Sequence, residues 1–383
     1  MQIQSAATEP RTQAYSLKNM QVFFDYQTFT TTQYNGISRY FVELAARLSV
    51  YPDVKVKVVS PIIRSLFLGE QRSRVPTVGI DLSHVKRLPA KVVRPIDAVL
   101  FNSYVKFDVP DIVHETAYGR KKTVPKSARM VTTIHDTIPD RFPNIFVNNK
   151  KHRAAIQNAL NRADRVICVS QSTRRDVQEL YEVDPSRLSV VMLGSSLAPS
   201  PDGPLDIGMP YFLHVGARYE YKNFTGLIKA FGDARLFRTH KLVSFTRLPF
   251  EAMDFNAMDS AGVPRESVVR VGGDDRMLAR YYAGAEALVF PSLYEGFGIP
   301  LVEAMHCGCP IISSNTSSLP EVAGDAALYC DPRDIRSISE AMVQVASSPA
   351  MKSLLIAKGQ ARAPSLSWAR CAAETYAIYK DLL

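Results

Sequence analysis

Short apolar runs and amphipathic segments alternate along most of the chain. The apolar runs are rich in Val and Ile and are seldom interrupted by polar residues, which is typical of strands buried on both faces of a sheet. The segment 37–48 instead repeats apolar residues at the spacing of an amphipathic helix. This alternation predicts parallel sheets with helices on both faces.

The predicted elements fall into two groups. In the first half we expect strands at 20–26, 54–59, 99–101, 112–114, 131–135 and 166–169, and helices at 37–48 and 153–163. In the second half the alternation restarts, with segments at 211–215, 224–231, 241–245, 267–271, 276–283, 287–291, 311–314 and 320–323. Each group has the pattern of a doubly wound α/β domain.

A proline-rich break separates the two groups. Residues 197–210 contain four prolines in fourteen residues and lack periodicity, as a linker does. At 383 residues the chain also exceeds the size at which one core stops growing. We therefore predict a disordered start at 1–18, a first domain at 19–198, a linker at 199–210, a second domain at 211–364 and a terminal helix at 365–383.

Composition and charge narrow the class of protein. No stretch approaches the length of a spanning helix and the first 18 residues lack an apolar middle, so we expect a cytoplasmic protein, soluble or peripheral. The five cysteines are expected to be buried thiols, without disulfides or zinc. Residues 1–200 hold 28 Lys and Arg against 17 Asp and Glu, whereas the remainder is nearly balanced. Without any nucleic-acid-binding signature, this basic half favours an anionic lipid or a pyrophosphate-linked acceptor over nucleic acid, or else a solvated surface with no partner.

The richest chemistry lies at 290–310, where a predicted strand leads into a glycine-rich turn and a helix. Gly296 and Gly298 have no Cβ and would let a ligand approach the backbone N–H groups. Pro300 suits a first helical position, so the partly positive helix end would face that ligand and favour phosphate. Glu295 and Glu303 are acceptors for hydroxyl groups. Together these features indicate a nucleotide-sugar.

This segment resembles the signature of the retaining glycosyltransferases of family four. It reads Pro-Ser-x-x-Glu-Gly-Phe-Gly-x-Pro-x-x-Glu-Ala-Met-x-x-Gly-x-Pro, with the two glutamates eight positions apart. The alternative is a strand, turn and helix that need Gly and Pro for geometry alone. The resemblance implies the GT-B fold, an α/β fold of two doubly wound Rossmann-like domains facing across a cleft, in which the terminal helix crosses back to the first domain. It also implies that the second domain binds the donor and the first the acceptor.

Further segments extend the resemblance. The segment 212–231 is similar to the family stretch whose Arg and Lys hold the donor diphosphate, here Arg218 and Lys222, although both could be ordinary surface cations. The segment 36–41 resembles the N-terminal glycine loop of a bacterial polysaccharide subgroup, but the family more often has two glycines and here Asn35 precedes Gly36. His135 resembles the histidine at a strand end of the family. His135 and His114 are expected to point into the cleft, or else to be core histidines.

The resemblance assigns roles to these residues. Glu303 would bind the ribose, Glu295 the hydroxyls of the sugar, and His135 the transferred sugar or its phosphate. The donor site would be completed by a set of signature residues and cations: Gly36, Arg218, Lys222, Gly296, Phe297, Gly298 and Ile299. Because the sequence has no Asp-x-Asp and no metal-ligand spacing, we expect neither a metal nor a cofactor.

The predicted reaction is transfer of a hexose with retention of anomeric configuration. The subgroup resemblance favours GDP-mannose or a GDP-deoxyhexose as donor and a bacterial surface glycan, such as lipopolysaccharide O-antigen or capsule, as acceptor. A sugar-phosphate synthase, a nucleotide-sugar epimerase and a non-catalytic sugar-binding protein remain alternatives. A nicotinamide dehydrogenase is disfavoured because no Gly-x-Gly-x-x-Gly follows a strand.

A basic and apolar region of the first half suggests contact with a membrane. Lys86, Arg87, Lys91 and Arg94 lie near an apolar group in the sequence: Ile62, Ile63, Leu66, Phe67 and Leu68. We predict that the first domain docks on the inner leaflet, where a lipid-linked glycan would present its sugar end. The same charge could instead serve a soluble acidic acceptor.

Overall fold

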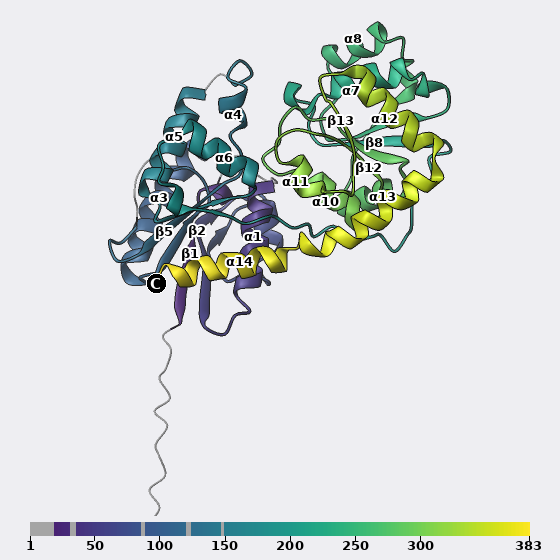
Figure 1. Cartoon of the computed structure of the whole chain (residues 1–383). Coiled ribbons are helices and arrows are strands. Elements are labelled where there is room, and N and C mark those ends of the chain that lie inside the picture. The colour runs from purple at the N-terminus through teal and green to yellow at the C-terminus, as the bar shows by residue number, and fades with distance from the viewer. Residues whose placement is uncertain (1–18, 31–35, 86–88, 120–123, 147–148) are drawn as a thin grey trace, which may run out of the picture.

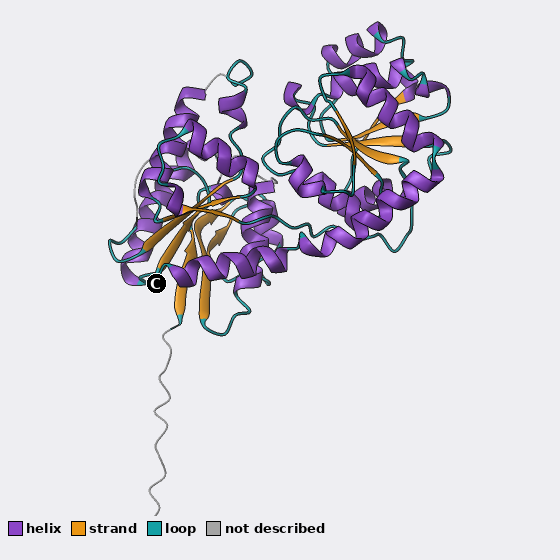
Figure 2. Cartoon of the chain, viewed as in Figure 1, coloured by secondary structure: helices purple, strands orange, loops and turns teal. Residues whose placement is uncertain are grey.

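The chain forms two α/β domains side by side, each a parallel sheet with helices on both faces (Figures 1 and 2). The computed structural model describes residues 19–30, 36–85, 89–119, 124–146 and 149–383. The expected disorder of 1–18, and the positions of Asn35, Lys86 and Arg87, lie outside the described residues. The predicted fold class is confirmed.

The first sheet has seven parallel strands in the order β3-β2-β1-β4-β5-β6-β7. Its strands are β1 (Met20–Phe24), β2 (Val54–Ile63), β3 (Thr77–Asp81), β4 (Ile112–Glu115), β5 (Arg129–Ile134), β6 (Arg165–Cys168) and β7 (Leu188–Val190). The strand order reverses between β1 and β4, and ligands of such sheets bind beyond the strand ends at that point.

Six α-helices of the first half surround this sheet, and they are α1 (Gly36–Leu48), α2 (Leu66–Glu70), α3 (Ala90–Phe107), α4 (Ile138–Arg141), α5 (Asn149–Arg162) and α6 (Gln171–Leu180). The short 3-10 helices η1 (Thr28–Thr30) and η2 (Pro185–Arg187) lie in the connections. The strand predicted at 99–101 is wrong, because these residues lie inside α3. Three consecutive apolar residues do not distinguish a strand from a helix, and Val99 and Leu100 are exposed side chains rather than core.

The second sheet has six parallel strands in the order β10-β9-β8-β11-β12-β13, with its reversal between β8 and β11. The strands are β8 (Tyr211–Val215), β9 (Lys241–Phe245), β10 (Val268–Val271), β11 (Ala287–Phe290), β12 (Ile311–Ser314) and β13 (Leu328–Cys330). The helices are α7 (Phe224–Asp233), α8 (Ala252–Ser260), α9 (Asp275–Gly284), α10 (Ile299–His306), α11 (Leu319–Ala323), α12 (Ile335–Ser347) and α13 (Pro349–Arg362). The sequence pattern did not predict α8, β13, α12 or α13.

The last helix, α14 (Trp368–Asp381), returns to the first domain and lies beside α1, as predicted (Figure 1). Tyr379 OH lies 2.6 Å from His114 Nδ1 in the core of the first domain. Tyr376 donates a 2.6 Å hydrogen bond to Asp53, and its ring stacks on Tyr51. The terminal helix therefore fastens the second half of the chain to the first sheet.

All five cysteines are free and buried, in agreement with the expected inert thiols. Burial raises the pKa of the Cys168 thiol to about 12. No helix in the described part of the chain is long and apolar enough to cross a membrane.

Candidate active site

Glu295 is held rigidly in the loop 291–298, which joins β11 to α10. Lys222 Nζ donates to its Oε1 at 2.6 Å, and Ser292 Oγ donates to the same oxygen at 2.8 Å. The backbone N–H of Glu295 donates to Ser317 Oγ at 2.9 Å. The carboxylate is therefore fixed at both its backbone and its side chain, with one oxygen already engaged.

Lys222 reaches Glu295 from the neighbouring strand β8, through the short 3-10 helix η3 (Glu220–Lys222). Its ammonium group lies over the rings of Tyr221 and Phe290, 5.4 Å from each centroid. Because β8 and β11 flank the reversal of the second sheet, the pair occupies the place where such sheets bind ligands. Two residues that are 73 positions apart, and that were each predicted for the site, are thus brought together.

Arg218 has a different environment from Lys222. Its Nε donates to Asp254 Oδ2 at 3.1 Å, and its terminal nitrogens donate to the carbonyls of Leu248 and Pro249. The guanidinium also lies 5.0 Å from the ring centroid of Phe250. Only 4% of the side chain is exposed, so Arg218 fastens the 248–254 segment in this structure, and its contact with a diphosphate stays a prediction.

Glu303 is buried in the second turn of α10. Tyr282 OH donates to its Oε2 at 2.9 Å. Burial raises the pKa of this carboxyl, while the Tyr282 hydrogen bond and the positive charge of Arg39 oppose the rise. Arg39 belongs to α1 of the first domain and forms a 2.6 Å ion pair with Asp275 of α9. The surroundings of Glu303 therefore include a cation from the opposite domain.

The two signature glycines leave room for protein atoms in this structure. A Cβ on Gly296 would lie 1.9 Å from the carbonyl oxygen of His135, in the first domain. A Cβ on Gly298 would lie 2.6 Å from Leu319 Cδ2, and this glycine also has a φ of +103°, which disfavours other residues. At Gly296, the expected room for a ligand is taken by the backbone of the other domain.

Three further predicted donor-site residues have simpler surroundings. The side chain of Phe297 is buried in the core, and Ile299, the first residue of α10, packs partly against the same core. Pro300 follows within the first turn, as predicted. Gly36 begins α1, and a Cβ there would meet no atom of the described residues within 4 Å. Any contact of Phe297 with a ligand would have to come from its backbone.

His135 follows β5 and faces the signature loop across the domain boundary. Its ring packs edge-on against Tyr40, with centroids 5.1 Å apart. The buried Nε2 has no hydrogen-bond partner among the described residues, and burial lowers the pKa of the imidazole to about 4. His135 is therefore a neutral imidazole that retains an unused hydrogen-bonding atom.

His114 is a core histidine, so the expectation that it points into the cleft is wrong. Its Nδ1 lies 2.6 Å from Tyr379 OH and its Nε2 lies 2.8 Å from Thr133 Oγ1. Both ring nitrogens are thus satisfied within the protein, and burial lowers the pKa of the ring to about 3. The strand-end position was correct, but the sequence does not indicate that α14 covers this side chain.

Contacts between the domains were missed by the sequence analysis. Ser170 Oγ and Thr173 Oγ1, at the start of α6, donate to the carbonyl of Gly296 at 2.7 and 3.1 Å. The carboxylate of Glu321 accepts the backbone N–H groups of Gln171 and Ser172 at 3.1 and 3.0 Å. The first turn of α6 is therefore bound to the signature loop and to α11. Ser170 also caps α6, and no sequence pattern indicates its partner in the second domain.

Comparisons with known proteins agree with this arrangement. The family model "Glycosyltransferase Family 4" matches residues 34–196, and "Glycosyl transferases group 1" matches residues 201–362. O-antigen chain mannosyltransferase B of Escherichia coli is 28% identical over 91% of this chain and 96% of its own length. O-antigen chain mannosyltransferase RfbU of Salmonella typhimurium is 27% identical over 82% of this chain and 88% of its own.

The fold comparison gives the same architecture. The structure of sucrose-phosphate synthase from Thermosynechococcus elongatus superimposes with a TM-score of 0.75 at 18% identity, over 95% of this chain and 99% of that one. The two family models divide the chain at the segment that separates its two sheets. The chain therefore belongs to the glycosyltransferases of family four and is a glycosyltransferase with the GT-B fold.

Proposed function

We propose that the chain transfers a hexose, with mannose favoured, from a nucleotide-sugar to a growing bacterial surface glycan such as lipopolysaccharide O-antigen or capsule. The observation that carries the proposal is the 2.6 Å contact between Lys222 and Glu295 where β8 and β11 end. The contact supports the proposal because an ammonium group, which suits a diphosphate, lies beside a carboxylate, which suits sugar hydroxyls. The O-antigen mannosyltransferases, aligned over most of both chains, support the choice of sugar and glycan.

In this proposal the nucleoside diphosphate binds against Lys222 and the amino-terminal end of α10. The bond between the sugar C1 and the phosphate oxygen breaks, and negative charge grows on that oxygen. Lys222 and the helix end are positive groups that are already in place to stabilise it. With these two positive groups we expect the reaction to proceed without a divalent ion.

The two glutamates would hold the two sugars of the donor. Lys222 and Ser292 both bind Oε1 of Glu295, and no described residue donates to its Oε2, which can accept hydroxyls of the hexose. Glu303 lies farther along α10, beside Tyr282, and would accept the ribose hydroxyls. The roles differ because Glu295 binds the group that moves, whereas Glu303 binds the group that stays with the phosphates.

We propose that the configuration at C1 is retained. The acceptor hydroxyl would attack from the face that the diphosphate leaves, and the departing phosphate oxygen would take its proton. A new bond from C1 to the acceptor oxygen replaces the bond from C1 to phosphate. The neutral His135, with its unpartnered Nε2, would donate or accept a hydrogen bond to the transferred sugar or its phosphate.

A donor and acceptor panel tests the proposal. Thermal shifts with GDP-, UDP- and ADP-sugars should give the largest stabilisation with GDP-mannose or a GDP-deoxyhexose, because a ligand that binds the folded state raises its stability. Transfer to a mannose-terminated oligosaccharide should then occur in the presence of a chelator, and the anomeric coupling of the product should show retention. Inversion, or loss of activity that magnesium restores, would contradict the mechanism. Transfer only to hexose phosphates would instead identify a sugar-phosphate synthase.

A further inference from the structure

Helix α3 carries an exposed apolar stripe. The stripe consists of Val92, Ile96, Val99, Leu100 and Phe107, all of them exposed. Their spacing puts them on one side of the helix, opposite the face that buries Phe101 and Val105. Phe107 is 91% exposed, which is rare for a phenylalanine on a monomeric soluble surface. The exposed Ser103 lies on this side between Leu100 and Phe107. Apolar side chains exposed in this number indicate a surface that is covered by another molecule.

The exposed charged residues of α3 are all positive. Lys91 and Lys106 are exposed on α3, and its carboxylate, Asp97, is fully buried. Arg94 is also exposed, but it lies two turns before Phe101 and so on the side away from the stripe. The exposed surface of α3 is thus apolar and cationic, in the basic half of the chain. This combination is complementary to an anionic lipid interface, where apolar side chains enter the acyl boundary and lysines meet phosphates.

The apolar group first predicted to dock does not form such a surface. Ile63 and Leu68 are fully buried, and Ile62, Leu66 and Phe67 are half-buried. They support β2 and α2 rather than face solvent. Figure 1 places α3 instead on the flank of the first domain that faces away from the second domain.

The buried face of α3 is tied to the side of the first sheet where an acceptor would bind. Asp97 Oδ2 accepts a 2.8 Å hydrogen bond from Thr30 Oγ1, and Oδ1 accepts one of 2.8 Å from the backbone of Ile62. Thr30 belongs to η1, directly after β1, and β1 flanks the reversal of the first sheet. One helix therefore presents its outer face to solvent and fixes the switch-point loop with its inner face.

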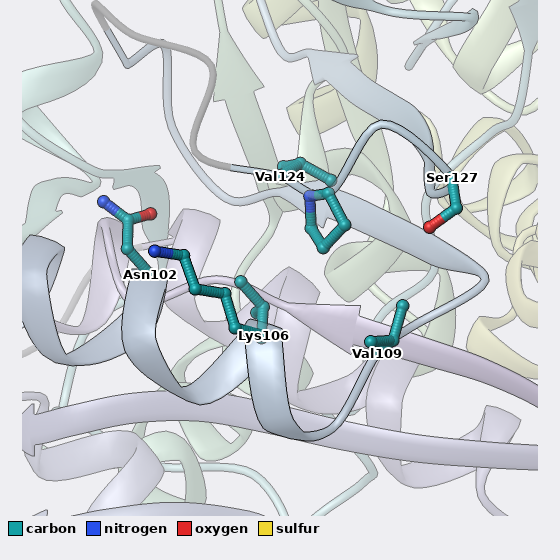
Figure 3. A pocket seen from close by; sticks show the side chains of 7 residues that line it. Asn102, Lys106, Val109, Val124 and Ser127 are labelled. Atoms are coloured by element: carbon teal, nitrogen blue, oxygen red, sulfur yellow. The ribbon is translucent and has the colours of Figure 1, made fainter.

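A recess beside the stripe adds to the docking surface. It has a volume of about 500 Å³ and lies between α3 and the segment 124–127. Figure 3 shows Asn102 and Lys106 along one wall, with Val124 and Ser127 opposite. Asn102 Oδ1 is buried there and has no hydrogen-bond partner among the described residues. The wall thus offers a cation and an amide next to apolar groups, which suits a lipid head group.

We propose that α3 lies in the interface of an anionic bilayer, with the stripe inserted and Lys91 and Lys106 on the phosphates. The first domain would then hold its switch-point loop at a fixed height above the membrane, within reach of a lipid-linked acceptor. The acceptor part rests on the proposed function, whereas lipid binding by α3 does not.

Vesicle flotation of the full chain tests the docking surface. Native protein should float with vesicles that contain phosphatidylglycerol and should not float with vesicles of phosphatidylcholine alone. NaCl at about 1 M should release it, because the Debye length is then about 3 Å and the charges are screened. Leu100→Asp should reduce the bound fraction about tenfold or more, because it puts a charge into the acyl boundary. The matched control is Leu354→Asp on α13, since Leu354 is 49% exposed and Leu100 is 47% exposed. The control should float as the native protein does.

Three outcomes would overturn the proposal. These are equal flotation of native protein and Leu100→Asp, no flotation with either lipid, and a native dimer that Leu100→Asp converts to a monomer without any vesicle binding. The last would assign the stripe to a second copy of the chain. Circular dichroism melting and nucleotide thermal shifts should be unchanged in Leu100→Asp, as should transfer to a water-soluble acceptor. If native protein floats but transfers no sugar, the result would support lipid binding by α3 and contradict the proposed function.

Discussion

Ser170 Oγ in the first domain donates a 2.7 Å hydrogen bond to the carbonyl oxygen of Gly296 in the second. The same hydroxyl oxygen accepts the backbone N–H of Thr173 and so caps α6. A single serine thus begins a helix of one domain and holds the signature loop of the other. The loop that carries Glu295 is positioned by both domains, so catalysis should depend on how closely they meet.

Gly296→Ala tests this dependence. The added Cβ would overlap the carbonyl of His135, which lies 1.9 Å away, and would push the domains apart. We expect turnover to fall about 100-fold, because displacement of the reacting groups by about 1 Å has that effect. Nucleotide binding to the second domain should change far less, and it can be followed by thermal shift.

The matched control is Gly272→Ala, whose Cβ would lie 3.6 Å from Thr246 O in ordinary contact. Its turnover should stay near that of the native protein. Small-angle scattering with nucleotide present should show a larger radius of gyration for Gly296→Ala only. Native turnover in Gly296→Ala would mean that the contact with His135 is absent from the reacting state.

Glu295 and Glu303 should respond differently to removal. Glu295→Ala should chiefly lower kcat, since its carboxylate is expected to bind the sugar that moves. Glu303→Ala should chiefly raise KM for the donor, since ribose binding is equal before and during transfer. Each loss should be worth about 2 to 3 kcal/mol, as for a hydrogen bond to a charged group. Initial rates over a range of donor concentrations separate the two effects.

Tyr282→Phe is the matched variant for Glu303. It keeps the ring and removes only the 2.9 Å hydrogen bond to the carboxylate. It should raise KM for the donor more weakly than Glu303→Ala does. Native kinetics in both glutamate variants would refute the assignment of the site.

The roles of Arg218 and Lys222 can be distinguished by the effect of each substitution on the free energy of unfolding. Arg218→Met leaves the buried Asp254 without its ion-pair partner and should lower the free energy of unfolding by about 3 to 5 kcal/mol. Arg218→Met with Asp254→Leu should recover much of that loss, because no charge is left unpaired. Urea unfolding measures both. Lys222→Ala should lose about 100-fold or more in turnover, as when a charged group that stabilises a transition state is removed.

The double variant also decides the role of Arg218. If Arg218 only fastens the 248–254 segment, the stabilised double variant should transfer sugar at close to the native rate. If it moves to the diphosphate during the reaction, as the resemblance implies, turnover should stay low although the protein is stable again.

The second domain was largely predictable because its chemistry is encoded in consecutive residues. The signature from Pro291 to Pro310 contains its own turn, helix start and carboxylates, and the structure reproduces each of them. Lys222 was predictable from a strand end followed by cations. The partners Ser292, Tyr282 and Ser317 were not assigned, since their roles depend on loops that meet only in the folded domain.

The domain boundary and the first domain were less predictable. The contact of Glu321 with the start of α6 joins residues about 150 positions apart, and no local pattern announces it. The apolar run at 99–101 was predicted to be a buried strand, whereas it lies in a helix that exposes Val99 and Leu100 and buries Phe101. Predictions from periodicity rest on apolar residues facing the core of their own chain. They fail where apolar residues are exposed on the surface, as Val99 and Leu100 are.

His135 should act as a neutral hydrogen-bonding group. Burial lowers the pKa of its imidazole to about 4, so the ring stays uncharged at neutral pH. His135→Asn keeps a hydrogen-bonding group at a changed position and should lower kcat about tenfold. The shape of the rate profile between about pH 5 and 8 should be the same in both proteins. A descending limb near the ordinary histidine pKa that disappears in His135→Asn would contradict the neutral role.

Glu115, at the end of β4, should make the protein less stable as pH rises. Burial raises the pKa of its carboxyl to about 8, the charge of Asp25 raises it further, and Arg162 opposes the rise. Its Oε1 accepts a hydrogen bond from Arg162 at 2.6 Å, whereas its buried Oε2 has no partner in the part of the chain that the structure describes. Between the ordinary glutamate pKa and about 8 the folded state therefore holds a proton that the unfolded state has released. The contribution of Glu115 to the free energy of unfolding therefore falls across this window and is constant above it.

Glu115→Gln removes this titration and keeps an oxygen for Arg162. The unfolding free energy of the variant minus that of the native protein should therefore increase by about 1 kcal/mol per pH unit through the window. His114 and His135 have lowered pKa values and give the opposite slope below the ordinary histidine pKa. They are present in both proteins, so their effect cancels in the difference. Urea unfolding of both proteins at about pH 5, 6.5 and 8 measures this difference in unfolding free energy. A difference that does not change with pH would mean that Glu115 is already ionised in the folded state.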